Sequence, residues 1–138
     1  MIPYGKHHIS KEDIKSVIKV LKSNNLTQGP IIKIFENKIA NYVGAKYAVA
    51  VSSCTAGLHL AAIASNLKKG KTLLTSPITF VSTANVALLC GAKVDFVDID
   101  KETFNISLKN LSEKLIKAKK EKKIPKALVV VHMGGNPC

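Results

Sequence analysis

The sequence contains no arginine, and it has few acidic residues. All 21 of its basic residues are lysines, against 9 aspartates and glutamates, which gives a formal net charge of +12. A charge of this size first suggests nucleic acid or an anionic membrane as a partner. Proteins that read bases and phosphates, however, usually recruit the bidentate guanidinium of arginine. We therefore expect no nucleic-acid partner, and we expect the charge to attract a small anionic substrate such as a nucleotide diphosphate.

Tryptophan is also absent and only 5% of residues are aromatic, so aliphatic side chains must fill the core of a chain that is 46% hydrophobic. The three cysteines, Cys54, Cys90 and Cys138, are widely spaced and match neither a disulfide framework nor a zinc site. Unpaired thiols are typical of the cytoplasm. The chain has no charged-then-apolar leader and no apolar run of bilayer length, so we expect a cytoplasmic protein without a membrane or metal partner.

Two amphipathic helices are predicted near the start of the chain. Ser10 is a favourable N-cap and Asp13 follows three positions later, as in a capping box, which predicts a helix over residues 10–23. A second helix is expected from residue 31 to Gly44, its C′ residue. Apolar residues recur at helical spacing and form the expected buried faces: Ile14, Val17, Ile18 and Leu21 in the first helix, and Ile31, Ile34, Phe35, Ile39 and Tyr42 in the second.

The remaining sequence alternates short apolar strands with helices. Strands are predicted at 47–51, 72–75, 94–97 and 127–131, and helices at 56–67, 80–90 and 108–122. This alternation indicates an α/β fold with a mainly parallel sheet covered by helices on both faces. Residues 134–138 resemble a loop that leaves the last strand, where a further βα unit is expected to follow. The sequence therefore predicts a truncated domain.

Four small residues, Ser52, Ser53, Cys54 and Thr55, connect the first predicted strand to its helix. Ligands of open α/β sheets bind at the carboxyl edge of the strands, and the free N–H groups of a helix N-terminus favour phosphate there. Serine and threonine are also good helix caps anywhere. Because the segment matches neither a Walker loop nor a dinucleotide fingerprint, an anion site and an ordinary cap remain equal alternatives at this point.

Further polar and aromatic residues follow the later strands. Phe80 lies where an aromatic ring can stack on a flat cofactor, although a lone phenylalanine is more often buried in the core. Three aspartates could ligate Mg²⁺ or transfer protons, but a turn followed by an aspartate N-cap explains them better: Asp95, Asp98 and Asp100. His132 ends the last apolar strand, and we expect it to be hydrogen-bonded at the sheet edge rather than to contact a cofactor.

Ordered motifs extend over essentially the whole chain: Leu26–Pro30, Phe35-Glu36, Tyr42–Leu58, Ser76–Asn85, Gly91–Asp100, Val131-His132 and Gly135–Cys138. In order and spacing they resemble the DegT/DnrJ/EryC1/StrS family of sugar aminotransferases that depend on pyridoxal 5′-phosphate (PLP). The resemblance implies the large domain of a fold type I PLP-dependent transferase, truncated. It further implies an N-terminal helix and substrate-side loop over residues 1–30, and the first part of the PLP-binding large domain over residues 31–138.

The resemblance also implies roles for particular residues. Cys54, Thr55 and Ala56 match the positions that hold the PLP phosphate, although Cys54 stands where the family often has Ala or Gly. Phe80 matches the aromatic residue that stacks on the pyridine ring, and Asn85 is a weaker candidate near that ring. The cradle that the residues alone leave undecided is thus expected to bind PLP.

The substrate side is implied in the same way. Residues that match the border of the sugar-nucleotide site are Tyr4, Asn24, Asn25, Leu26 and Thr27. The opening six residues, the Leu26–Pro30 loop and the Asn-Pro-Cys ending most resemble the branch that acts in pseudaminic acid biosynthesis. That branch transfers an amino group from glutamate to a UDP-linked 4-keto-6-deoxy-N-acetylhexosamine, and the full-length proteins are expected to be homodimers.

Two residues of the family have no counterpart in this sequence: the aspartate that pairs with the pyridine nitrogen and the lysine that forms the Schiff base. PLP chemistry depends on both groups, and none of the 21 lysines has the required context. We therefore assign no catalytic residue and expect this chain alone to be inactive. Two alternatives remain: part of a related sugar dehydratase that replaces the lysine with histidine, or a non-catalytic module that pairs with a separately encoded second half.

Overall fold

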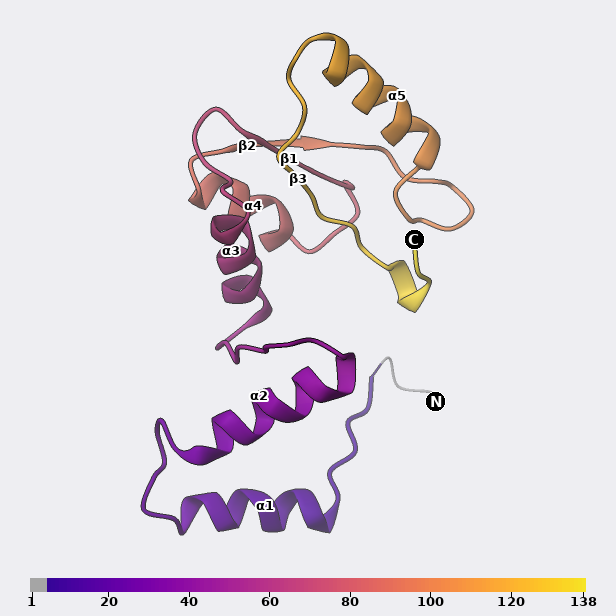
Figure 1. Cartoon of the computed structure of the whole chain (residues 1–138). Helices are drawn as coiled ribbons and strands as arrows, with labels where there is room; N and C mark the ends of the chain where they lie inside the picture. Colours follow the sequence, from indigo (N-terminus) through magenta and orange to yellow (C-terminus); the bar gives the residue numbers. More distant parts are fainter. Residues whose placement is uncertain (1–4) are drawn as a thin grey trace. The chain divides into compact units, whose positions relative to one another are not determined.

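The computed structural model describes residues 5–138, which divide into two compact units: one that ends at Ala50 and one over Val51–Cys138 (Figure 1). The sequence-based division after residue 30 therefore falls inside the first unit, because that unit also contains residues 31–50. The assignment of residues 1–30 to the substrate side and of residues 31–138 to the PLP-binding domain remains a prediction.

The first unit contains α1 (Lys11–Leu21) and α2 (Pro30–Val43). The predicted capping box is confirmed: Asp13 N–H donates to Ser10 Oγ at 3.1 Å, and Ser10 N–H donates to Asp13 Oδ2 at 2.8 Å. The carboxylate accepts from the Ser10 N–H and also from the Ser10 hydroxyl, at 2.9 Å; these two bonds, the backbone one first, hold the pKa of the Asp13 carboxyl below its ordinary value. At the other end, Gly44 adopts the left-handed conformation with φ of 69°, which confirms it as the residue that ends α2.

The apolar faces of both helices were predicted to be buried, and that prediction is wrong. Within this unit each of the nine residues named for these faces is exposed: Ile14, Val17, Ile18, Leu21, Ile31, Ile34, Phe35, Ile39 and Tyr42. Two helices alone offer too little surface to cover both faces, since burial requires a second layer of structure. The periodicity correctly identified the apolar face of each helix, although nothing in the unit covers it.

The predicted first strand, residues 47–51, has no regular secondary structure and belongs to no sheet. A strand forms only by pairing, and no neighbouring strand lies beside this segment among the described residues. Ala50 N–H is instead held by the side chain of Glu36 on α2, which accepts through Oε1 at 3.0 Å. Tyr47 and Val49 are exposed.

The second unit alternates strands and helices. Its elements are α3 (Cys54–Ala64), β1 (Thr72–Thr75), α4 (Ser82–Leu89), β2 (Lys93–Phe96), α5 (Leu108–Lys120), β3 (Ala127–Leu128) and a short 3-10 turn (Met133–Gly135). The strands form a parallel sheet in the order β2-β1-β3, with Thr72 opposite Lys93 and Leu73 opposite Ala127. The α/β class with a parallel sheet is confirmed.

The last strand is shorter than predicted. Pairing begins where Lys126 N–H donates to Thr72 O and ends where Val129 N–H donates to Leu74 O, at 2.9 Å. β1 itself ends at Thr75, and Pro77 just beyond it has no N–H to continue a ladder. Residues 130–131 therefore leave the sheet.

Each face of this sheet is covered by helices (Figure 1). On one face, α3 and α4 pack over Leu73, with Val86 and Ala87 at the centre of the cluster. On the other face Leu74, Val97 and Ile106 pack together, and Leu111 of α5 lies against them. The two faces follow from the period of two along β1, since neighbouring side chains point in opposite directions.

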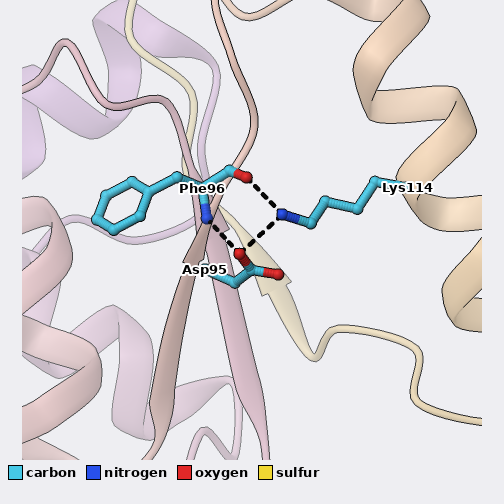
Figure 2. A network of polar contacts seen from close by, with 3 residues as sticks. All are labelled: Asp95, Phe96 and Lys114. Atoms are coloured by element: carbon cyan, nitrogen blue, oxygen red, sulfur yellow. Dashed lines mark hydrogen bonds and ion pairs between the residues drawn. The ribbon is translucent and has the colours of Figure 1, made fainter.

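One polar network joins α5 to strand β2, which lies at one edge of the sheet (Figure 2). Lys114 Nζ lies 2.7 Å from Asp95 Oδ1 and also donates to the carbonyl oxygen of Phe96. Burial opposes ionisation of Asp95, but the hydrogen bond from Lys114, the Phe96 N–H and the Lys114 charge together lower the pKa of this carboxyl. Asp95 is therefore occupied in a structural contact.

Candidate functional site

The predicted phosphate cradle lies at the N-terminus of α3. Ser53 is the N-cap: its Oγ accepts from Ala56 N–H at 3.2 Å, and its carbonyl accepts from Gly57 N–H. The N–H groups of Cys54 and Thr55 donate to no acceptor among the described residues, as expected for the first turn of a helix. The segment is therefore both a cap and a potential anion site, since two N–H groups and the Thr55 hydroxyl remain free.

Phe80 is presented by the turn between β1 and α4. The residue is 74% exposed, so the alternative that Phe80 is buried in the core is wrong. The turn brings the chain from the carboxyl end of β1 to α4, whose buried residues face the sheet, and leaves Phe80 outside that packing. An exposed aromatic ring at a strand's carboxyl end is well placed to stack on a flat ligand.

The structure brings the cradle and the aromatic residue together. A surface hollow in the second unit is lined by Thr55 from α3 and by residues of the turn and of α4: Phe80, Val81, Ser82, Asn85, Leu88 and Leu89. Thr55, Phe80 and Asn85 are separated in sequence and were each named from sequence. One surface therefore combines a hydroxyl beside free N–H groups, an aromatic ring and an amide. None of the residues lining it is a lysine.

The predicted substrate-side residues lie in the first unit. Asn24, Asn25, Leu26 and Thr27 form the exposed connection between α1 and α2, where Ser23 Oγ donates to Asn25 O at 3.3 Å. Tyr4 lies outside the described residues. The assignment of this loop to the substrate site stays a prediction.

The acidic cluster and His132 have structural roles. Asp100 Oδ1 accepts from the N–H groups of Thr103 and Glu102, which confirms the turn and lowers the pKa of this carboxyl. The prediction of an aspartate N-cap is wrong, because Ser107 caps α5. His132 Nδ1 accepts from Cys138 N–H at 3.0 Å, as a hydrogen-bonded histidine would. Within residues 5–138, no group of three or more acidic, histidine or cysteine side chains is placed to hold a metal ion.

Two residues near the sheet's carboxyl edge were missed by sequence reasoning. Asn105 is buried, with 6% of its surface exposed, and its side chain binds backbone groups of Met133 and Asn136. Thr75 is fully buried and its Oγ1 has no hydrogen-bond partner among the described residues. Neither residue belongs to a motif that predicts its burial or its contacts, because a single Asn or Thr is typical of any loop or strand.

Comparison with known proteins identifies the class. The sequence model of the DegT/DnrJ/EryC1/StrS aminotransferase family matches residues 7–138, so this chain belongs to that family. Among its relatives, the spore coat polysaccharide biosynthesis protein SpsC of Bacillus subtilis is 43% identical over 137 residues. The UDP-4-amino-4,6-dideoxy-N-acetyl-beta-L-altrosamine transaminase of Campylobacter jejuni (serotype O:23/36) is 42% identical over 136 residues.

The chain spans only about a third of these relatives: each alignment covers 99% of this chain but 34% and 35% of the two relatives. Solved structures agree in fold. Helicobacter pylori PseC, an aminotransferase of pseudaminic acid biosynthesis, superposes with a TM-score of 0.82 at 33% identity, over 99% of this chain and 35% of its own. Spr1654 of Streptococcus pneumoniae in its PLP form gives 0.84 at 26% identity, over 99% and 33%. The described helices include none long and apolar enough to cross a membrane.

Proposed function

We propose that this chain forms the cofactor-binding front part of a PLP-dependent aminotransferase that acts on a nucleotide-linked sugar. The observation that carries the proposal is the shared hollow, where Thr55 at the free N-terminus of α3 and the exposed Phe80 ring line one surface. Family membership directs the proposal toward PLP, because PLP carries both a phosphate for the cradle and a flat ring for the aromatic side chain.

The residues present fit the phosphate and ring of PLP. The N–H groups of Cys54 and Thr55 and the Thr55 hydroxyl would hold the phosphate, and the positive end of the α3 dipole favours its charge. Ala56 adds a small side chain but no free N–H, because Ser53 already accepts from it. Phe80 would lie against one face of the ring. When bound, PLP supplies an electron sink for amino-group transfer.

The proposed substrate is a UDP-linked 4-keto-6-deoxy-N-acetylhexosamine, with glutamate as the amino donor and surface-glycan biosynthesis as the setting. The support comes from the names of the Campylobacter and Helicobacter relatives and from the motif Leu26–Pro30. Tyr4 and residues 24–27 would border the nucleotide sugar. The three unpaired cysteines favour the cytoplasm as the place of action. We further propose that the working protein is a homodimer without a nucleic-acid or membrane partner.

The 138-residue chain is proposed to bind PLP weakly and to lack transaminase activity. No lysine lines the hollow, and the sequence offers no aspartate in the context that pairs with the pyridine nitrogen. Pairing with a second polypeptide that carries these groups is the alternative function. The exposed apolar faces of α1 and α2 favour it, because such surfaces normally contact other structure.

The cofactor half of the proposal is tested by PLP binding to the purified chain, followed by ³¹P NMR of the PLP phosphate. Thr55→Val removes the hydroxyl and keeps the side-chain shape, and we expect an affinity loss of about three- to tenfold from one lost hydrogen bond. Phe80→Ala should weaken PLP but not inorganic phosphate. Phe35→Ala, which alters a similarly exposed ring in the other unit, is the control. Equal PLP affinity in all four proteins would contradict the proposal.

The inactivity is tested with glutamate, PLP and the keto-sugar nucleotide. We expect no amino sugar above a no-protein control. Product formed by the chain alone would contradict the assignment of the reacting lysine to another segment. Activity that appears only after a co-purified polypeptide is added would favour the two-part alternative.

A further inference from the structure

We propose that the hydroxyl pair Thr79–Thr83 is a positioning device that fixes Phe80 for ligand stacking. Thr79 Oγ1 donates to Thr83 Oγ1 at 2.9 Å, across the turn that carries Phe80. The inference rests on the proposed role of Phe80 as the ring-stacking residue. It adds two residues that line no part of the hollow themselves.

Packing does not hold the ring of Phe80. Phe80 is 74% exposed, and its neighbours Ile78 and Val81 are exposed as well. A side chain in this setting samples several rotamers, and the φ and ψ angles of its backbone limit which rotamers are allowed. The position of the ring therefore depends on how firmly the turn is anchored.

The turn is anchored at its helical end. Thr83 N–H donates to Phe80 O at 2.9 Å, and Asn85 N–H donates to Val81 O at 3.0 Å. α4 has no side-chain cap, because Val81 occupies the N-cap position and its side chain has no atom that can accept a hydrogen bond. The Thr79 hydroxyl, four residues before Thr83, is thus the side chain that joins the turn to the first turn of the helix.

The anchor point is rigid because Thr83 is buried. Only 5% of its surface is exposed, and Val86 and Ala87 on the same helix belong to the main core cluster. Thr79 is half-buried and connects this packed helix to the exposed residue that follows it. On the strand side, the buried Ser76 donates through Oγ to Ile78 O at 3.2 Å. Phe80 is therefore held between a core helix and the end of β1.

A ring fixed before the ligand arrives binds more tightly, because less conformational entropy is lost on stacking. Loss of one hydrogen bond that fixes the turn should weaken PLP by about two- to tenfold. Inorganic phosphate has no ring, so its affinity for the α3 N-terminus should not change. This contrast separates a positioning role from general damage to the site.

The test uses the whole chain with Thr83→Val and Thr79→Val, which remove a hydroxyl and keep the shape. Thr83→Ser restores the hydroxyl and should rescue the effect. Thr72→Val is the matched control, because the Thr72 side chain makes no hydrogen bond among the described residues. Two readouts are taken: NMR relaxation of the Phe80 amide and ring in the free chain, and dissociation constants for PLP and for inorganic phosphate.

We expect both valine variants to increase the mobility of Phe80 and to weaken PLP alone, while Thr83→Ser and Thr72→Val match the wild type. Unchanged Phe80 mobility in both valine variants would overturn the inference, whatever the affinities. If the wild type binds no PLP but the valine variants still loosen Phe80, the positioning device stands and the proposed cofactor fails. If Thr83→Val unfolds, the half-buried Thr79→Val decides the outcome alone.

Discussion

Asn105 Oδ1 accepts a hydrogen bond from the Met133 N–H at 2.9 Å, although the two residues lie 28 positions apart. The Asn105 Nδ2 group donates to Asn136 O at 3.0 Å. One buried side chain thus joins the loop before α5 to the segment after β3. The segment after β3 no longer pairs with a strand. The Asn105 side chain takes the place of a strand partner for two of its backbone groups, the Met133 N–H and the Asn136 carbonyl.

Asn105→Ala should therefore destabilise the second unit by about 1–3 kcal/mol, because it removes two hydrogen bonds worth about 0.5–1.5 kcal/mol each. Urea unfolding followed by far-UV circular dichroism measures the change. Asn110→Ala is the control, because the side-chain amide of Asn110 makes no hydrogen bond among the described residues. If Asn105→Ala lowers the free energy of unfolding no more than Asn110→Ala does, solvent replaces the Asn105 hydrogen bonds and the prediction is wrong.

Thr75→Val should stabilise the chain. The Thr75 side chain is fully buried with an unpartnered Oγ1, and a buried hydroxyl without a partner loses its hydrogen bond to water. Valine has nearly the same shape and no polar atom to desolvate, so we expect a gain of about 1 kcal/mol in the free energy of unfolding. A shift of the urea midpoint to higher concentration tests this, and a shift to lower concentration would reveal a hydrogen bond at Thr75.

The ion pair between Lys114 and Asp95 should make the free energy of unfolding depend on pH. The pKa of Asp95 is lowered in the folded chain relative to an unfolded value of about 3.9, so the pair stabilises above about pH 4 and the contribution is lost as pH falls through the folded pKa. Lys114→Met should cost about 0.2–1 kcal/mol near neutral pH, since both side chains are partly exposed.

The difference between wild type and Lys114→Met should shrink as the pH is lowered to about 2, where Asp95 is protonated, leaving only the Lys114 bond to Phe96 O. Unfolding at both pH values measures it. Lys117→Met, on the same helix and exposed, should show no such change. A difference that grows at low pH would mean that Asp95 is not the partner that matters.

The comparison of sequence and structure separates local from non-local information. The capping box at Ser10 and the end of α2 at Gly44 are set by nearby residues, and sequence predicted both of them. Periodicity identified the apolar side of α1. It could not show whether any surface packs there, because that depends on elements elsewhere.

The candidate site shows the same limit. Motif order brought Thr55 and Phe80 into one hypothesis, and the structure places both at one hollow. The general tendency of phenylalanine to be buried gave the wrong expectation for Phe80. That tendency is an average over all phenylalanines and takes no account of the turn that places this ring outside the core. Asn105 was missed for the opposite reason: its partners, Met133 and Asn136, lie far along the chain.

The isolated chain should self-associate. The apolar faces of α1 and α2 are exposed, and in the second unit Leu88 and Leu89 of α4 are exposed as well. Contiguous apolar surface of this kind normally contacts other protein, and burying it releases about 25 cal/mol per Å². We expect the sedimentation-derived mass to rise with concentration and to fall again in mild detergent.

A lysine placed on the apolar side should weaken that association, whereas the same lysine on the polar side should not. Val17→Lys alters the exposed apolar face of α1, and Ser16→Lys, the neighbouring residue, adds the same charge outside it. The net charge of both variants is equal, so a difference in mass reports the apolar contact and not repulsion. A wild-type chain that stays monomeric at high concentration would contradict the predicted self-association.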